Sequence, residues 1–398
     1  MNTRQLKRGY YLLEALNSFA SAFFLSYLVF LTQKNFGFGN RGNMLVMALH
    51  GFFYLLASWQ GGKFIQRVGC FTALKRGYAG MALGLMLGLM IPGVAGALIS
   101  LAAWTVPLCL IWPSLEALVT EGEEFAGTAR AVGIYNVVWA AANAVAFCVG
   151  GWLWETLGAR GLFGLPLVLM LVQLGLTAWL ERQAGKVPMA PRVAAPETHH
   201  PERAAFEQKL PPRRFLQMAW LANPFAYVAI NTVGAVIPQL AARFQLSPAE
   251  AGLFCSLWFY ARLAAFVVLW QWTGWHYRFR WLVAAFVALT GSFAAMLLAD
   301  SFWVVVGAQV TLGLAVGLLY YSSLFYSMDA GETKGEHGGL HEAAIGAGIC
   351  GGPLLGATAL TLAPTLPHAG VHAVTALLGV GLLALLWLRF RPRGGDFS

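Results

Sequence analysis

Residues 181–214 read ERQAGKVPMAPRVAAPETHHPERAAFEQKLPPRR, and they form the only long polar segment of the chain. Apolar stretches of membrane-spanning length occupy nearly everything on either side of it. Its prolines and mixed charges are typical of a flexible linker. The layout therefore predicts an integral membrane protein in which the linker 181–214 joins two helical halves, residues 1–180 and 215–398.

The apolar stretches have the length of transmembrane helices. Apolar residues make up 58% of the chain and charged residues 11%, against about 25% charged in an ordinary soluble domain. A helix needs about 20 mostly apolar residues to cross the hydrocarbon core, and continuous apolar runs argue against the alternating strands of a barrel. We expect an all-α fold with six spans per half, near residues 10–32, 43–62, 74–91, 94–118, 130–156, 161–180, 215–240, 250–272, 281–299, 302–327, 338–363 and 369–390.

The net charge of +9 is interpreted as a topology signal, because the basic residues gather on one side of the predicted membrane. The other side holds only Lys34, Arg41, Arg160 and Arg243. Positively charged loops stay in the cytoplasm, so we expect a multi-pass protein of the cytoplasmic (inner) membrane with both termini and the linker in the cytoplasm. We also expect contact with anionic membrane lipids and no nucleic-acid partner. The basic side carries Arg4, Lys7, Arg8, Lys63, Arg67, Lys75, Arg76, Arg182, Lys186, Arg192, Arg203, Lys209, Arg213, Arg214, Arg278, Arg280, Arg389, Arg391 and Arg393.

The two halves match each other weakly at a constant spacing. Residues 17–20 of the first span, NSFA, correspond to residues 223–226 of the seventh, NPFA. The same spacing relates Gly150 in the fifth span to Gly356 in the eleventh. Each match alone is weak, but a shared spacing predicts a parallel repeat of six helices. Such repeats place a substrate site near the midplane between the halves, with access alternating as one half rocks against the other.

The loop after the second span carries the most specific motif. Residues 62–69 read GKFIQRVG, and Lys75 and Arg76 follow. This loop resembles the Gly-x-x-x-Asp-Arg-x-Gly loop of the major facilitator superfamily, and the likeness in layout covers essentially the whole chain. The resemblance implies a two-half fold of twelve transmembrane helices and a secondary transporter. Gln66 stands where the family has aspartate, which would weaken a charged latch to a hydrogen-bonded one.

Two further features bear on this resemblance. Residues 352–356, GPLLG, are similar to a Gly-Pro-x-x-Gly pattern found in the eleventh span of many members. The arginine that proton-coupled drug exporters of the family carry in the fourth span is missing from residues 104–118. This absence argues against drug–proton antiport.

Ionisable residues within spans are costly and mark functional sites. Arg262 is the deepest charge in the chain and is a candidate anchor for a substrate anion or a partner for a carboxylate, with a structural ion pair as the alternative. Glu14 and Asn17 share one helix face. Glu14 is a candidate coupling carboxylate or a pair at the cytoplasmic rim. His50 is a candidate proton carrier or a neutral histidine bonded to a helix carbonyl.

Other polar residues divide into a cavity set and a gate set. Asn136 and Asn143 lie seven residues apart, hence on one helix face, and the resemblance implies that these two, Asn231, Tyr320 and Tyr321 face the cavity. Amides that bridge helices are the alternative. We expect Glu116 to join the basic residues of a cytoplasmic gate, with His341 and Glu342 at the equivalent place in the second half. The expected gate comprises Gly62, Gln66, Arg67, Gly69, Glu116, Arg130, Arg278, His341 and Glu342.

Other functional classes find little support. There is no Gly-rich phosphate loop with its Lys-Ser/Thr, and the five cysteines have no metal-ligand spacing, so we expect no cofactor, no metal and no enzyme. The sequence favours a monomeric secondary transporter that moves a small solute by alternating access, with proton coupling left open. The alternatives are an exporter of lipid or drug-like amphipaths and a membrane sensor or scaffold that does not transport.

Overall fold

The computed structural model describes residues 2–123, 125–186, 210–330 and 336–391, without the side chains of 125–126, 328, 330 and 336–341. These residues are almost entirely helical and contain no strand. Ten of the described helices are long and apolar enough to cross a membrane. The chain is therefore an all-α, multi-pass membrane protein, as the apolar runs predict. The centre of the predicted linker, 187–209, lies outside the described residues.

The helices before the linker begin close to the predicted positions. Gly69 ends one helix and precedes the next with a positive φ of 82°, a conformation that glycine adopts at no steric cost. This turn lies at the second glycine of the GKFIQRVG loop. The helices are α1 (Thr3–Phe36), α2 (Asn40–Val68), α3 (Cys70–Met90), α4 (Gly93–Leu108), α5 (Ile111–Thr120) and α6 (Phe125–Ala184).

The helices after the linker follow the same apolar pattern. Ser247 is the N-cap of one of them, and its side chain accepts a hydrogen bond from the Glu250 N–H. The Glu250 carboxylate in turn accepts a hydrogen bond from the Ser247 N–H at 2.8 Å. These two bonds form a capping box. The helices are α8 (Pro212–Arg243), α9 (Pro248–Cys255), α10 (Leu257–Gln271), α11 (Phe279–Leu298), α12 (Phe302–Ala330), α13 (Glu336–Leu362) and α14 (Ala369–Phe390).

The separation into twelve individual spans differs from the prediction in three places. The predicted span 94–118 is broken between α4 and α5, where Pro107 removes a backbone donor and the Leu110 N–H bonds to the Pro107 carbonyl at 3.0 Å. The predicted span 250–272 is broken at Ser256. The predicted spans 130–156 and 161–180 are joined in α6 through a kink at Gly158, whose φ of 58° is not helical.

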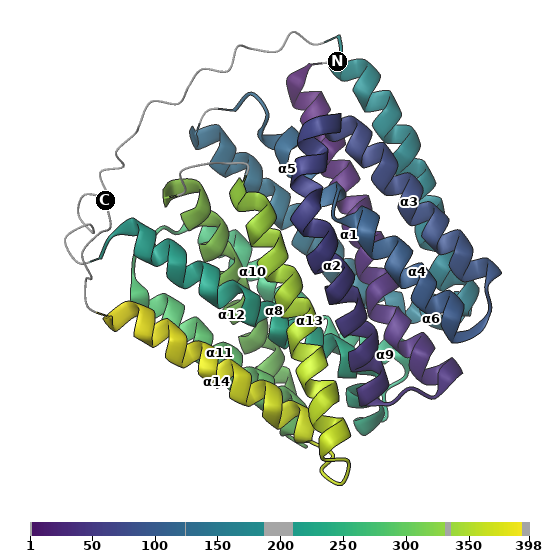
Figure 1. Ribbon diagram of the computed structural model, residues 1–398, viewed down its shortest axis with the longest axis vertical. Coiled ribbons are helices and arrows are strands. Elements are labelled where there is room, and N and C mark those ends of the chain that lie inside the picture. The colour runs from purple at the N-terminus through teal and green to yellow at the C-terminus, as the bar shows by residue number, and fades with distance from the viewer. Residues whose placement is uncertain (1, 124, 187–209, 331–335, 392–398) are drawn as a thin grey trace.

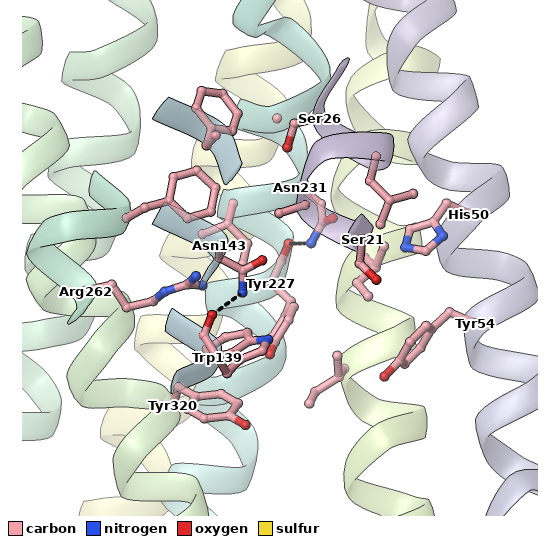
Figure 2. Close-up of a pocket in the computed structure, with 18 of the residues that line it drawn as sticks. Ser21, Ser26, His50, Tyr54, Trp139, Asn143, Tyr227, Asn231, Arg262 and Tyr320 are labelled. Carbon is pink, nitrogen blue, oxygen red and sulfur yellow. Dashed lines mark hydrogen bonds between the residues drawn. The ribbon is translucent and has the colours of Figure 1, made fainter. Parts of the chain in front are cut away.

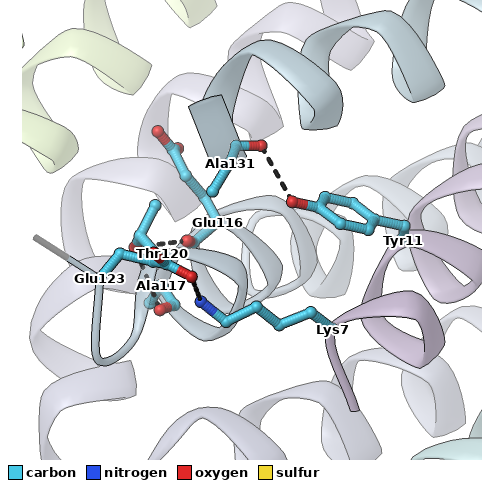
Figure 3. A network of polar contacts seen from close by, with 7 residues as sticks. All are labelled: Lys7, Tyr11, Glu116, Ala117, Thr120, Glu123 and Ala131. Carbon is cyan, nitrogen blue, oxygen red and sulfur yellow. Dashed lines mark hydrogen bonds and ion pairs between the residues drawn. The ribbon is translucent and has the colours of Figure 1, made fainter. Parts of the chain in front are cut away.

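Polar contacts identify which helix ends share a side of the molecule. Lys7 near the start of α1 pairs with Glu123 just before α6, and the Tyr11 hydroxyl donates to the Ala131 carbonyl at 3.2 Å (Figure 3). Lys75 near the start of α3 pairs with Glu181 near the end of α6 at 2.7 Å. The starts of α1 and α3 therefore share one side with both ends of α6. We call this side the linker end and the opposite side the far end.

The two groups of helices meet along several pairs of elements. Figure 1 shows α1 to α4 on one side of the molecule and α11 to α14 on the other. Between them, α2 packs along α13, and α6 packs against α9 and α10. A side chain at Gly51 of α2 would collide with the backbone of Cys350 in α13, and one at Gly346 of α13 with the backbone of Leu55 in α2. Small residues thus let the halves approach closely, as in other membrane bundles.

Candidate functional site

A cavity of about 200 Å³ lies between the two groups of helices, and both contribute to its wall (Figure 2). Its position agrees with the expected site between two repeats. Its volume is below the roughly 300–1,000 Å³ of drug-sized pockets, which favours a small occupant. The polar and aromatic residues of the wall are Ser21, Ser26, His50, Tyr54, Trp112, Glu116, Tyr135, Trp139, Asn143, Phe147, Tyr227, Asn231, Trp258, Phe259, Arg262, Tyr320 and Glu342.

Arg262 extends from α10 into this cavity and has only aromatic neighbours as partners. Its guanidinium carbon lies 4.3 Å from the ring centre of Trp139 and 5.2 Å from those of Trp258 and Phe259. The side chain is 3% exposed, and Nε has no hydrogen-bond partner among the described residues. The two ion pairs found there involve other residues.

The energetics of this arrangement are unfavourable without a further partner. Removing an ion from water costs several kcal/mol even after relaxation. A cation over an aromatic face recovers about 2 kcal/mol when both are desolvated. Arg262 is therefore a buried charge that the described side chains compensate only in part. An anion entering the cavity would supply the missing interaction.

Trp139 of α6 forms the surface on which Arg262 lies. Its ring packs nearly parallel to Phe266, at 5.9 Å and 20°, and to Tyr320, at 5.4 Å and 22°. Phe266 belongs to α10 and Tyr320 to α12, so the stack joins the two halves of the molecule. Packing on several sides fixes the ring before any ligand arrives, and this reduces the ordering cost of binding.

His50 lies across the cavity from Arg262, on α2 (Figure 2). Its Nδ1 is 2.7 Å from the Thr105 hydroxyl, which donates to the Leu101 carbonyl at 2.7 Å. The single hydroxyl proton is used in that second bond, so Nδ1 carries the proton and donates to Thr105. Nε2 is then an acceptor. The partner of His50 is thus a side chain, which differs from the alternative of a bond to a helix carbonyl. A role as proton carrier stays a prediction.

Two amides lie between these residues in the cavity wall. Asn143 Nδ2 donates to the Trp139 carbonyl at 3.0 Å, and Asn231 Nδ2 donates to the Tyr227 carbonyl at 2.9 Å (Figure 2). Both bonds are local, within one helix. Each amide therefore uses one N–H in a bond to a carbonyl of its own helix, and its oxygen remains available as an acceptor. The sequence prediction that Asn143 and Asn231 face the cavity agrees with this geometry.

Two carboxyl groups that the sequence assigns to a gate also line the cavity. Glu116 comes from α5 and Glu342 from α13, and they are close enough to interact electrostatically. The Tyr54 hydroxyl of α2 donates to Glu342 at 2.5 Å, across the contact between the halves. No ion pair is found for either carboxyl within the described residues. No group of three or more His, Cys, Asp or Glu side chains in that part of the chain is placed to hold a metal.

Glu14 and Asn17 do not line the cavity, although both are fully buried in α1. The Ser18 hydroxyl donates to Glu14 at 2.5 Å. Tyr135 and Trp112, which are part of the wall, lie beside the Glu14 carboxyl. Glu14 is thus one layer behind the cavity, so the structure does not place it at a shallow rim.

Two further predicted positions, Asn136 and Tyr321, also lie outside the wall. Asn17 and its repeat counterpart Asn223 are both buried amides without a hydrogen-bond partner among the described residues. Asn136 is 1% exposed, and its Nδ2 has no hydrogen-bond partner among the described residues. Tyr321 packs on Trp275 at 5.9 Å rather than facing the cavity.

The remaining gate residues whose side chains the structure describes lie outside the cavity wall. Gln66, Arg67, Gly69 and Arg130 are exposed, and a side chain at Gly62 would meet open space. Their assembly into a gate stays a prediction. Arg278 is half-buried and precedes α11. The side chain of His341 lies outside the described residues.

Apart from Tyr320, the aromatic residues of the wall were not predicted from the sequence. Tyr54 follows His50 by four residues, and Trp258 and Phe259 precede Arg262 by four and three, so each shares a helix face with a predicted residue. This spacing was the available signal. Trp139 lies three residues after Asn136 and four before Asn143, so the same spacing applies to it.

Comparisons with known proteins concern the fold of the whole chain. No family model matches the chain, and no curated protein sequence does either. Among solved structures, a bacterial homologue of the human drug peptide transporters PepT1 and PepT2 aligns with a TM-score of 0.70 and 16% identity, over 98% of this chain and 97% of that one. The nucleoside transporter NupG aligns with a TM-score of 0.68 and 10% identity, over 97% and 98%. The chain therefore shares the fold of these two transporters.

Proposed function

We propose that the chain is a secondary active transporter that carries one small polar or charged solute through the central cavity by alternating access. The observation that carries this proposal is the cavity itself, whose polar groups come from both halves. A solute bound there would contact Arg262 on one side and His50 on the other. Rocking of the halves about such a site is the general mechanism of transporters built from repeats.

The contacts between the halves support this movement. The pairs α2–α13 and α6–α9 approach closely at glycines, which have no side chain to interlock with the other helix. The Tyr27 hydroxyl donates to the Phe147 carbonyl at 2.7 Å, and Glu155 accepts the Ala249 N–H at 2.9 Å near the far end. The second bond joins the two halves. We propose that it breaks when the far end opens.

Proton coupling is the finer part of the proposal. The sequence suggested Glu14 or His50 as the titrating group, and the geometry adds Glu116 and Glu342 in the cavity wall. Glu342 is bound by Tyr54 from the other half, so its protonation would be linked to the contact between halves. We propose that this pair of carboxyl groups, rather than Glu14, exchanges protons with the solute path.

An exporter of amphipathic compounds is the second candidate. The many aromatic rings of the wall favour it. The volume of about 200 Å³ opposes it, because drug-sized molecules occupy larger pockets. The sensor or scaffold hypothesis has no supporting observation in the cavity.

The test is flux in proteoliposomes containing the purified full chain. Radiolabelled sugars, amino acids, organic anions, nucleosides and cationic drugs are offered with and without an inward proton gradient. Saturable uptake of one class, absent from protein-free liposomes, is the expected result. Absence of flux for every class, from protein that unfolds cooperatively on heating, would contradict transport and favour the scaffold. Uptake that is indifferent to the gradient would contradict proton coupling alone.

A further inference from the structure

The Arg262 guanidinium is oriented to bind an anion in the cavity. Its guanidinium carbon lies over the Trp139 ring, 4.3 Å from the ring centre, and a contact of this kind uses none of the N–H groups in a hydrogen bond. Nε is buried and has no hydrogen-bond partner among the described residues. An arginine edge fits a carboxylate with two parallel hydrogen bonds. Figure 2 shows the side chain pointing toward Asn143 and the open part of the cavity.

The wall around this group is aromatic on both halves. Phe259 packs on Phe147 at 5.0 Å and 27°, and Trp139 is held by Phe266 and Tyr320. A small inorganic anion would leave these rings facing empty space. An occupant with a flat or apolar body would cover them and gain from their burial.

The positions of the other charges favour a particular arrangement. Glu342 lies about two turns from the start of α13, toward the linker end, and Glu116 is one turn from the end of α5. Arg262 lies near the middle of α10. The cavity thus presents its cation deep in the bundle and its carboxyl groups nearer one entrance. An anionic headgroup would seat at Arg262, with the rest of the solute away from it.

We infer that the solute is a small monocarboxylic acid anion with an aromatic or apolar body, its carboxylate on the Arg262 edge and its body against Trp139 and Phe259. This inference rests on the proposed transport function and names the solute class. A donor group on the body would find acceptors in the Asn143 and Asn231 oxygens and in His50 Nε2. The volume of about 200 Å³ limits the body to about one ring.

A competing explanation keeps Arg262 inside the protein. In another conformation it would pair with Glu116 or Glu342, and its role would be to hold the halves together. The two explanations differ in ligand selectivity. A solute anchor distinguishes a carboxylate from its uncharged amide, whereas an internal ion pair does not.

The experiment measures binding to the detergent-purified full chain by isothermal titration calorimetry. The probes are benzoate, phenylacetate and 3-phenylpropionate, each with its neutral amide, together with acetate and phenethylamine. We expect at least one aromatic carboxylate to bind about thirtyfold or more tightly than its amide, because truncating a buried charge pair typically costs that much. Acetate, which lacks the body, is expected to bind more weakly than the aromatic anion.

Variants test separately the contact of the carboxylate with Arg262 and the contact of the solute body with Trp139. Arg262→Gln and Arg262→Lys should weaken the aromatic anion about thirtyfold and severalfold respectively, since lysine keeps the charge but loses the planar fork. Trp139→Leu should weaken the aromatic anion about tenfold and acetate much less. Arg160→Gln and Trp152→Leu, both at exposed positions, are the matched controls and should leave binding unchanged.

Four binding outcomes would each overturn the inference. Equal binding of acid and amide would, and so would preference for phenethylamine or failure of every aromatic carboxylate to bind. Unchanged binding in a folded Arg262→Gln protein would assign Arg262 to the internal ion pair. Flux of another solute class in the proteoliposome test would then leave transport standing while this solute class falls, so the two failures are distinguishable.

Discussion

At the scale of single residues, the bond between Tyr54 and Glu342 links the cavity to the contact between the halves. We predict that Glu342→Gln and Glu116→Gln abolish accumulation driven by a proton gradient but retain exchange of solute across the membrane. An amide keeps the size and part of the hydrogen bonding yet cannot take up a proton. The measurement compares gradient-driven uptake with counterflow in proteoliposomes. Glu121→Gln, at an exposed position, is the control, and gradient-driven uptake by both cavity variants would contradict the assignment.

The bond from His50 to Thr105 makes a second prediction at this scale. Thr105→Val keeps the shape of the side chain but removes the acceptor of the His50 Nδ1 proton. Leaving a buried donor unpaired costs about 1–3 kcal/mol, so the unfolding temperature in detergent should fall. Thr105→Ser restores the hydroxyl and should recover most of the loss. An unchanged unfolding temperature in Thr105→Val would show that His50 uses another partner or the other tautomer.

At the scale of helices, apolar length was enough to predict where most elements lie but not which face each one presents. Arg262 was found because a charge within an apolar run is costly wherever it points. Tyr320 and Tyr321 are adjacent, and only Tyr320 reaches the cavity, since neighbouring residues on a helix point in directions about 100° apart. Glu14 lies behind the cavity wall, because Tyr135 and Trp112 from other helices stand beside its carboxyl group. Depth within a span follows from sequence, whereas rotation depends on packing between distant segments.

The close contact between α6 and α9 gives a prediction for these elements. A side chain at Gly151 would collide with the Pro248 carbonyl, whereas one at Gly164 in the same helix would meet open space. Gly151→Ala should push the halves apart near the far end and speed the labelling of Ser26→Cys in the cavity by a membrane-impermeant thiol reagent. Both proteins need a background without the five native cysteines.

Gly164→Ala is the matched control for Gly151→Ala. Alanine is favoured over glycine within a helix by roughly 0.5–1 kcal/mol, so this variant should be neutral or slightly more stable and should label at the original rate. If Gly151→Ala labels no faster than Gly164→Ala, the α6–α9 contact is not part of the barrier at the far end.

At the scale of the whole molecule, the distribution of charge predicts its orientation. The ion pairs Lys7–Glu123 and Lys75–Glu181 place the starts of α1 and α3 at the linker end, where most of the basic loops gather. Positive loops remain in the cytoplasm. In whole cells, a cysteine at the exposed position Arg160 should react with an impermeant reagent, and one at the exposed position Arg67 should react only after the membrane is permeabilised. Labelling of Arg67→Cys in intact cells would reverse the orientation, and with it the side from which a solute first reaches Arg262.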